Sequence, residues 1–538
     1  MESIRIRNLR SLKDTGEVEL KPLTLLVGKN SSGKSTFLRT FPLFKQTIET
    51  KTNEPILWYS SRYVDFGSFH ESLNKITAKE EEEKKNISFD FKFSIPSSVV
   101  QMGTVDILSY YSLRPSRMSR IYNYNYSNSN RKTPFKISIE TNQKSLSKFT
   151  ISIEDHLLEM TLKEDEKFSQ VGLKINGVPI SETSSLVARY AKDYSQLLPL
   201  IFSDKSNSSE NNYFRDELFK IFQSLAYTST RRNTISEFIE DIKFGDKSEI
   251  INNIKSQDTT ANVLLENLKA LESDNEVMQQ IIINYIGMNI NPIITMCNNY
   301  IEQYFSSINY IAPIRASAER YYRIQGLSVD DIDPQGENIP MIFNNMSDIE
   351  KENYNHWLFG NFGFQISASP TEGHSSIRIK YSNGEEVNLA DTGFGYSQIL
   401  PITLVLWQTS KQERKDIFAY SGLYKADYNF FNLVIEQPEL HLHPAIQAKL
   451  IDAFIKIIML CKEKSIDIKI IIETHSETMI NRIGYIIAKN IEEFTEDLVK
   501  VIIFENDEVF DTKLNVSTYS ENGYLKKWPL GFFEPEGI

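Results

Sequence analysis

The segment that most constrains this chain is a glycine-rich loop between a strand and a helix. Residues 28–35 read Gly-Lys-Asn-Ser-Ser-Gly-Lys-Ser. They follow the apolar run 23–27 and lead into residues 35–46, whose apolar positions recur with helical spacing. Pro42 is expected to kink or shorten this helix. The backbone N–H groups of such a loop surround an anion at a helix N-terminus. A chance glycine-rich turn is the alternative, but the order strand, loop, helix favours a phosphate-binding loop.

Each residue type in the loop suits a nucleoside triphosphate. Gly28 and Gly33 permit the tight backbone path, Lys34 is expected to reach the β and γ phosphates, and the Ser35 hydroxyl is expected to bind Mg²⁺. We therefore predict ATP and Mg²⁺ as ligands. The predicted ATP-binding residues are Gly28, Asn30, Ser31, Ser32, Gly33, Lys34, Ser35 and Thr36.

Three downstream segments are candidates for the rest of the site. The apolar strand 431–435 ends in Glu436, which we expect to hold Mg²⁺ together with Ser35. A second apolar run, 468–472, leads to His475, placed to hydrogen-bond a γ-phosphate. Residues 392–398 read Thr-Gly-Phe-Gly-Tyr-Ser-Gln and open an apolar helix, whose N-terminus suits a further phosphate contact.

Together these motifs resemble the ABC-type ATPase heads of the SMC, RecF and OLD kind. Residues 393–398 are similar to the signature motif, 436–438 to the Walker B segment, 440–444 to the D-loop region, and His475 to the switch histidine. In such heads the signature motif of one protomer caps the nucleotide of the other. The resemblance therefore implies a homodimer or higher oligomer joined by ATP. A simple helix-start turn is the alternative. The signature residues that the resemblance assigns are Gly393, Gly395, Ser397 and Gln398.

Gln437 departs from the pattern of these heads, which usually carry a glutamate there as the general base. A neutral amide orients water but takes no proton. We therefore predict catalytic roles for Glu436, Gln437 and His475, with slow turnover and a long-lived ATP-bound state. Glu439 is a second candidate base, although a structural role is favoured.

A narrower resemblance comes from residues 8–12, 63–69, 310–315 and 528–533. These segments are similar to a prokaryotic group that includes the ATPase subunit of Septu and retron-associated antiphage systems, whose operons often add an HNH nuclease. The resemblance implies a nuclease partner in antiphage defence, and a retron reverse transcriptase with its msDNA as a further partner. Two rivals stay open: a RecF-like DNA-repair ATPase that acts directly on DNA, and an ATP-bound scaffold that never hydrolyses.

The predicted fold class is α/β: an ABC-type P-loop head split by an insertion with a small β region and a helical domain. A chain of 538 residues is too long for one compact core. We expect an N-terminal head lobe at 1–75, a β-rich insertion at 76–182, a helical insertion at 183–306 and a C-terminal head lobe at 307–538.

Charge and composition limit the partners. Lys and Arg number 59 against 71 Asp and Glu, so the net charge of −12 excludes a basic field over the whole protein. One local basic and aromatic segment surrounds residues 122–130 and suits nucleic acid, with a solvated loop as the alternative. Its basic residues are Arg114, Arg117, Arg120, Arg131, Lys132 and Lys136.

Other features point to a cytoplasmic protein without a zinc site. The two cysteines, Cys297 and Cys461, fit neither a zinc ribbon nor a disulfide framework. The start has no apolar signal region, and no apolar run is long enough for a bilayer, so we expect no membrane partner. Glu439, His441 and His443 alternate like metal ligands, but a turn after residues 436–438 explains them better.

Two arginines in the later part of the chain are left open. Arg315 and Arg320 follow an apolar strand. They are candidates for contacts with phosphates or a neighbouring chain, and surface salt bridges explain them equally well.

Overall fold

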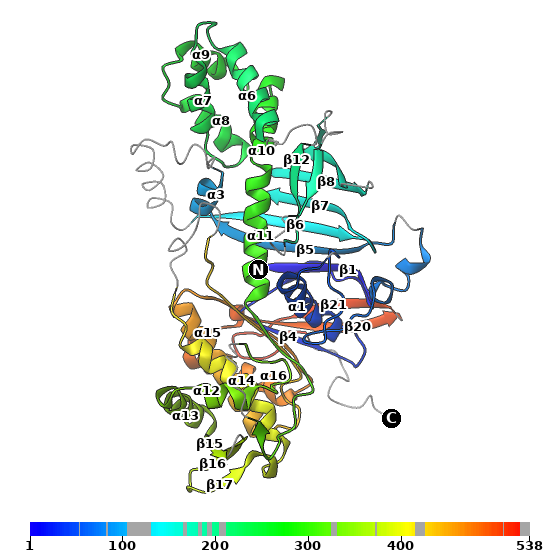
Figure 1. The fold of residues 1–538 in the computed structure, drawn as a ribbon, viewed down its shortest axis with the longest axis vertical. Helices are drawn as coiled ribbons and strands as arrows, with labels where there is room; N and C mark the ends of the chain where they lie inside the picture. Colours follow the sequence, from blue (N-terminus) through cyan, green and yellow to red (C-terminus); the bar gives the residue numbers. More distant parts are fainter. Residues whose placement is uncertain are drawn as a thin grey trace.

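The computed structural model describes residues 1–52, 54–81, 84–104, 131–164, 169–180, 186–190, 196–203, 211–323, 331–371, 374–414, 426–508 and 510–527. Within these ranges the chain forms three sheets and the helices that cover them (Figure 1). The predicted α/β fold class is confirmed.

A mostly parallel sheet carries the phosphate-loop strand. Its order is β13-β18-β19-β4-β20-β21, and all neighbours are parallel except β20 and β21. The carboxyl ends of parallel strands meet at one edge, and ligands bind there. The strands are β4 (Leu23–Gly28), β13 (Ile308–Ile311), β18 (Phe430–Glu436), β19 (Asp467–Glu473), β20 (Val499–Glu508) and β21 (Asp511–Ser517).

Helices cover both faces of this sheet because alternate strand residues point to opposite sides. Leu26, Val434 and Ile471 share a core with α1 (Lys34–Glu49), which continues past Pro42. Their neighbours in the same strands share a second core with the helices of the other face. Those helices are α14 (Phe394–Ser410), α15 (Pro444–Glu463) and α16 (Glu477–Ala488).

An antiparallel sheet lies beside the parallel one and has the order β12-β11-β9-β8-β7-β6-β5-β1-β2, with β3 paired to β1 and β10 to β9. The first strand of the predicted head lobe, β1, pairs with β5 of the predicted insertion, with Ile4 opposite Phe91. The strands are β1 (Ser3–Leu9), β2 (Leu12–Asp14), β3 (Val18–Glu19), β5 (Ile87–Pro96), β6 (Lys132–Thr141), β7 (Leu146–Ile153), β8 (His156–Glu164), β9 (Ser169–Ile175), β10 (Val178–Pro179), β11 (Leu186–Arg189) and β12 (Leu200–Ser203).

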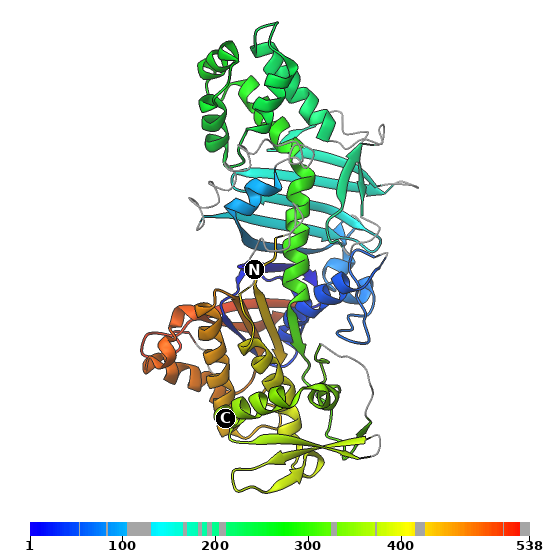
Figure 2. The ribbon, with the colours of Figure 1, turned by 60° about the vertical axis from the view of Figure 1, so that its left-hand side comes forward.

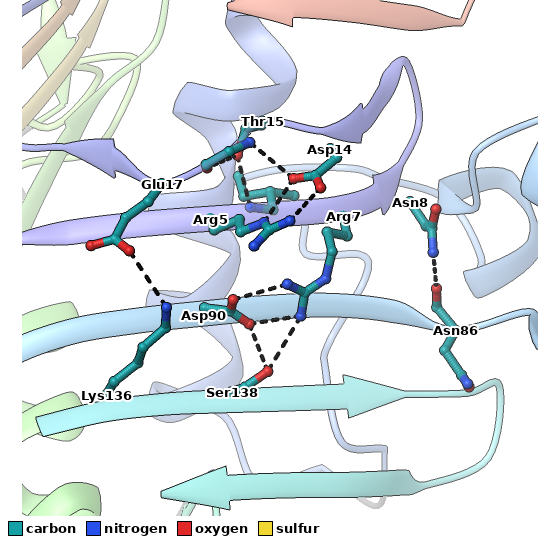
Figure 3. A network of polar contacts seen from close by, with 12 residues as sticks. Arg5, Arg7, Asn8, Asp14, Thr15, Glu17, Asn86, Asp90, Lys136 and Ser138 are labelled. Carbon is teal, nitrogen blue, oxygen red and sulfur yellow. Dashed lines mark hydrogen bonds and ion pairs between the residues drawn. The ribbon is translucent and has the colours of Figure 1, made fainter. Parts of the chain in front are cut away.

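A polar network fastens β1 to the strands of the insertion (Figure 3). Arg7 donates two hydrogen bonds of 2.8 and 2.9 Å to the buried Asp90 carboxylate on β5, and Ser138 on β6 donates a third of 2.6 Å. Charge-assisted bidentate pairs of this kind are strong and fix geometry. Together with the shared sheet, the network ties the phosphate-loop half of the head to the insertion, and the predicted limit at residue 75 stays a prediction.

A group of helices lies beyond the antiparallel sheet, and α11 runs from this group along the sheet toward the head (Figures 1 and 2). Phe44 of α1 stacks on Phe305 near the end of α11, with ring centroids 4.9 Å apart. The group consists of α6 (Asn211–Leu225), α7 (Arg232–Glu240), α8 (Lys247–Ser256), α9 (Asn262–Ala270) and α10 (Glu276–Met288), and α11 spans Ile290–Ser306. Two short helices lie elsewhere: α3 (Ser97–Gly103) follows β5, and α2 (Phe69–Ser72) lies next to β1.

A small sheet forms the opposite end of the molecule (Figure 1). Its order is β14-β16-β15, and β17 pairs with β16. Its elements and neighbouring helices are β14 (Tyr322–Arg323), α12 (Ile339–Asn345), α13 (Asp348–Phe362), β15 (Gln365–Thr371), β16 (His374–Lys380) and β17 (Glu386–Asn388).

Part of the predicted basic segment lies outside the described residues, as do residues 528–533. Arg114, Arg117 and Arg120 belong to that part. Arg131 donates to Glu249 at 2.9 Å, and Lys136 lies 3.4 Å from Glu17. Among the described helices, none combines the length and the apolar composition needed to cross a bilayer.

Candidate nucleotide site

The glycines of the loop are required by its backbone and its neighbours. Gly28 and Gly33 have φ of 151° and 95°, which side chains disfavour. A Cβ on Gly28 would lie 2.4 Å from the Phe504 carbonyl oxygen, and one on Gly33 would lie 2.7 Å from Ser11 Oγ. Asn30 and Ser31 are exposed at the tip, whereas Ser32 is buried. The loop is therefore held closely between Phe504 of β20 and the β1–β2 turn.

Lys34 and Ser35 begin α1 directly under the loop. Lys34 Nζ is buried and donates to the carbonyls of Gly28 at 2.9 Å and Lys29 at 2.8 Å. Burial lowers the pKa of Lys34. The next residue, Thr36, is partly exposed and its carbonyl accepts from Thr40 within the helix. The lysine thus lines the inside of the loop, where a phosphate would offer it stronger acceptors than carbonyls.

Glu436 ends β18 and is enclosed by donors from its own chain. Arg39 approaches it with two nitrogens, at 2.7 Å through Nε and 2.8 Å through Nη2. The Tyr310 hydroxyl on β13 donates to it at 2.5 Å. The bond to Glu436 raises the pKa of Arg39. The predicted magnesium ligand therefore lies at the expected strand end, and both of its oxygens are engaged.

Glu473 ends the neighbouring strand β19, directly opposite Glu436 in the sheet register. Its Oε1 accepts from the Ser35 hydroxyl at 3.0 Å and lies 3.9 Å from Lys34 Nζ. Burial, and after it the negative charge of Glu436, raises the pKa of Glu473. The Ser35 hydroxyl therefore meets Glu473, and the Mg²⁺ site predicted for Ser35 and Glu436 stays a prediction.

The turn after β18 holds the segment after β19. Glu439 accepts from the Thr474 hydroxyl at 2.9 Å and from the His475 N–H at 2.7 Å, which supports the structural role favoured for it. Gln437 has a φ of 44° and donates its N–H to the Glu473 carbonyl at 2.8 Å. Burial and the nearby Lys34 lower the pKa of His475. Gln437 and His475 thus flank the two glutamates at one edge of the sheet.

The predicted signature segment divides into an exposed and a buried part. Gly393 and Phe394 are exposed at the start of α14, with 59% of Phe394 accessible, and Gly395 lies against the His441 carbonyl. Ser397 is only 8% exposed, and its hydroxyl donates a hydrogen bond of 2.9 Å to the Phe394 carbonyl of the same chain. Gln398 is buried too. Ser397 therefore lies within the first turn of α14, and its predicted contact with a second copy stays a prediction.

The two arginines after β13 differ sharply. Arg320 forms a surface ion pair with Asp391 at 2.6 Å. Arg315 is 4% exposed, and its Nη2 donates to the Glu436 carbonyl at 3.0 Å. Burial lowers the pKa of Arg315 to about 10. One of the two is therefore a surface salt bridge, and the other supports the end of β18.

The alternating Glu439, His441 and His443 do not converge. Glu439 faces β19, and His443 caps α15 by accepting from the Ala445 N–H at 3.2 Å. Among the described residues, no group of three or more His, Cys, Asp or Glu side chains is arranged to hold a metal ion. A turn and a helix cap account for these residues.

The donor set at the strand ends nevertheless fits a hard divalent cation. Mg²⁺ prefers one or two carboxylates, a hydroxyl and several waters, with phosphates supplying the rest. Ser35, Glu436 and Glu473 offer such oxygens within one edge of the sheet. The Oε2 atom of Glu473 is buried without a hydrogen-bond partner among the described residues, so the site has a carboxylate oxygen to spare.

Comparison with known families identifies the chain. A family model described as "AAA ATPase domain" matches residues 1–480. The chain belongs to the AAA ATPase domain family. No curated protein sequence matches it.

Solved structures add little to this family assignment. The Smc head domain of Pyrococcus furiosus, with an extended coiled coil and bound to the C-terminal domain of ScpA, has 10% identity and a TM-score of 0.34, with 96% of each chain covered. The SMC head domain from Thermotoga maritima has 8% identity and a TM-score of 0.33, covering 96% of this chain and 97% of that one. Similarity at this level supports no further conclusion.

Sequence reasoning missed three residues at the site of this AAA ATPase domain. Arg39 lies one helical turn beyond Ser35, so the spacing of four placed it on the same face of α1. Tyr310 lies in the 310–315 segment, which was noted only for its resemblance. Glu473 ends an apolar strand just as Glu436 does, and the same rule applied twice would have found it.

Proposed function

We propose that this AAA ATPase domain binds ATP with Mg²⁺ at the carboxyl edge of its parallel sheet and hydrolyses it slowly. The observation that supports this most is the meeting of the phosphate loop with two buried strand-end glutamates. Lys34 receives the terminal phosphates, and Ser35 and Glu436 hold the cation. Bound Mg²⁺ would neutralise charge on the phosphates.

The remaining roles belong to groups beside the two glutamates. His475 hydrogen-bonds the γ-phosphate from the end of β19, and its lowered pKa favours the neutral ring. Gln437 orients the attacking water without taking its proton, so the ATP-bound state is long-lived. A scaffold that never hydrolyses is the alternative, and a single-turnover hydrolysis assay decides between them.

We further propose that ATP joins two copies through the exposed start of α14. Support comes from the exposure of Gly393 and Phe394 and from the contact of the Phe394 ring with His441, at 5.6 Å between centroids. An exposed aromatic residue is a common anchor at protein interfaces. The contact in trans is assigned to the predicted signature residues Gly393, Gly395, Ser397 and Gln398.

Sedimentation velocity with and without ATP and Mg²⁺ tests this association. We expect a nucleotide-dependent dimer for the unchanged chain and its loss in Phe394→Glu, which adds a charge at an exposed position. Tyr524→Glu, at another exposed aromatic, serves as the matched control. A sedimentation coefficient that ignores nucleotide would contradict the proposal.

The cellular role proposed here is control of an HNH-type nuclease in antiphage defence, in the cytoplasm. It rests on the resemblance of the 8–12, 63–69, 310–315 and 528–533 segments, with a retron reverse transcriptase and its msDNA as a further candidate partner. Co-expression with the neighbouring genes, followed by copurification and phage plating, tests it. Strong stimulation of hydrolysis by DNA alone would instead favour a RecF-like repair ATPase.

A further inference from the structure

Glu473 occupies a position that the proposed role of Glu436 leaves unexplained. Its strand β19 lies between β18 and the phosphate-loop strand β4, so Glu473 is one strand closer to the loop than Glu436. It is 4% exposed. Keeping a carboxylate buried is costly unless it has partners, so this position demands a function or a compensating contact.

The contacts of the two glutamates are unequal. Glu436 accepts three hydrogen bonds, two from Arg39 and one from Tyr310. Glu473 accepts one at its side chain, from Ser35, and its Oε2 has no partner among the described residues. A buried carboxylate oxygen without a donor is rare in proteins, and it points to a ligand that supplies one.

We propose that Glu473 is the residue that positions Ser35 and the hydration shell of the divalent cation, an inference that rests on the proposed ATP–Mg²⁺ function. Its Oε1 accepts the hydrogen bond that the Ser35 hydroxyl donates, and this bond turns the oxygen lone pairs of Ser35 toward the loop. Its Oε2 accepts from a water of the cation. Mg²⁺ keeps several waters in protein sites, and carboxylates beside the direct ligands orient them.

The same geometry gives Glu473 two opposite effects on nucleotide binding. Its carboxylate lies 3.9 Å from Lys34 Nζ, so it partly neutralises the positive charge that would meet the phosphates. Without a divalent cation this negative charge repels an anionic nucleotide, and with one it attracts the cation. Replacing Glu473 by a neutral residue therefore weakens the cation's contribution while sparing metal-free nucleotide binding. A residue with a merely structural role would weaken both.

Titration with mant-AMP-PNP, a fluorescent ATP analogue that is not hydrolysed, tests this without measuring activity. The Kd is measured in EDTA and in excess Mg²⁺. The Kd in EDTA divided by the Kd in Mg²⁺ gives the coupling between cation and nucleotide. We expect Glu473→Gln to lower this ratio about tenfold, the usual cost of losing a partner beside a metal ligand. Its Kd in EDTA should be unchanged or tighter. Asp452→Asn, which breaks the ion pair with Arg482, is the control and should keep the ratio.

A second pair of variants keeps the test decisive. Ser35→Ala should lower the ratio as well, and the double variant should lose no more than the larger single loss, because both residues act as one unit. If Glu473→Gln does not fold, Glu473→Asp replaces it, since it keeps the charge but withdraws it from Ser35 and should also lower the ratio.

The possible failures are distinguishable. A ratio unchanged in Glu473→Gln, or a parallel loss of affinity in EDTA and in Mg²⁺, overturns the role of Glu473 while nucleotide binding by the unchanged chain stands. Absence of binding by the unchanged chain overturns the proposed function itself.

Discussion

The ends of β18 and β19 carry the same residue in the same register but in different surroundings. Glu436 meets Arg39 and Tyr310, which occupy both of its oxygens. Glu473 meets Ser35 and keeps one oxygen without a partner. The first glutamate is satisfied by its own chain, whereas the second is only half satisfied.

This difference gives the two glutamates unequal effects on stability. A buried carboxylate with complete partners stabilises the fold, and removing it leaves those partners unpaired. A buried carboxylate with incomplete partners costs stability and is retained where it binds something. We therefore expect the free energy of unfolding to respond differently when each glutamate is replaced by glutamine.

The largest difference expected between the two glutamates is in the free energy of unfolding. Glu436→Gln should lower it by about 2 kcal/mol, less than for a fully buried pair because Arg39 is a third exposed. Glu473→Gln should change it by less than about 0.5 kcal/mol or raise it, because the substitution removes a desolvated charge beside Glu436. Urea unfolding of both variants measures the difference. Equal destabilisation would break the comparison.

A substitution at the residue after Glu436 sharpens the comparison. Gln437→Glu should raise the single-turnover hydrolysis rate at least about tenfold, because a carboxylate accepts the proton that an amide cannot. Gln412→Glu, an exposed position outside the site, is the matched control. A rate that stays at the level of the unchanged chain would show that Gln437 is not at the base position.

The smallest effect is expected at Glu439, which joins the two strand ends. Glu439→Gln keeps one acceptor oxygen for Thr474 or His475, so hydrolysis should slow by no more than about fivefold, the worth of one hydrogen bond of ~1 kcal/mol. The rate of hydrolysis under single-turnover conditions is the readout. A hundredfold loss would make Glu439 the base and contradict its structural role.

Much of this site follows from local sequence. The phosphate loop, the strand ending in Glu436 and the helix that begins after Gly393 are set by short-range patterns: apolar runs, glycines in turns and helical spacing. These patterns also predicted the α/β class. They act within about ten residues, so they predict each helix or strand but not the distant elements that it contacts.

The remainder depends on how distant segments meet. Arg39 bonds a residue 397 positions away, and Ser35 bonds one 438 positions away. Which glutamate faces Ser35 depends on strand order, because β19 lies between β18 and β4. The burial of Ser397 depends in the same way on the packing of α14 against neighbouring elements. No local pattern contains that information.

The central claim is that this chain holds ATP with a divalent cation where the phosphate loop meets the two strand ends. Calorimetric titration of the chain with ATP and Mg²⁺, beside Lys34→Ala, tests it most directly. The account predicts saturable binding to the unchanged chain and a Kd roughly 100-fold weaker for Lys34→Ala, because the loop loses its buried cation. Equal affinity of the two chains, or no binding to either, would contradict it.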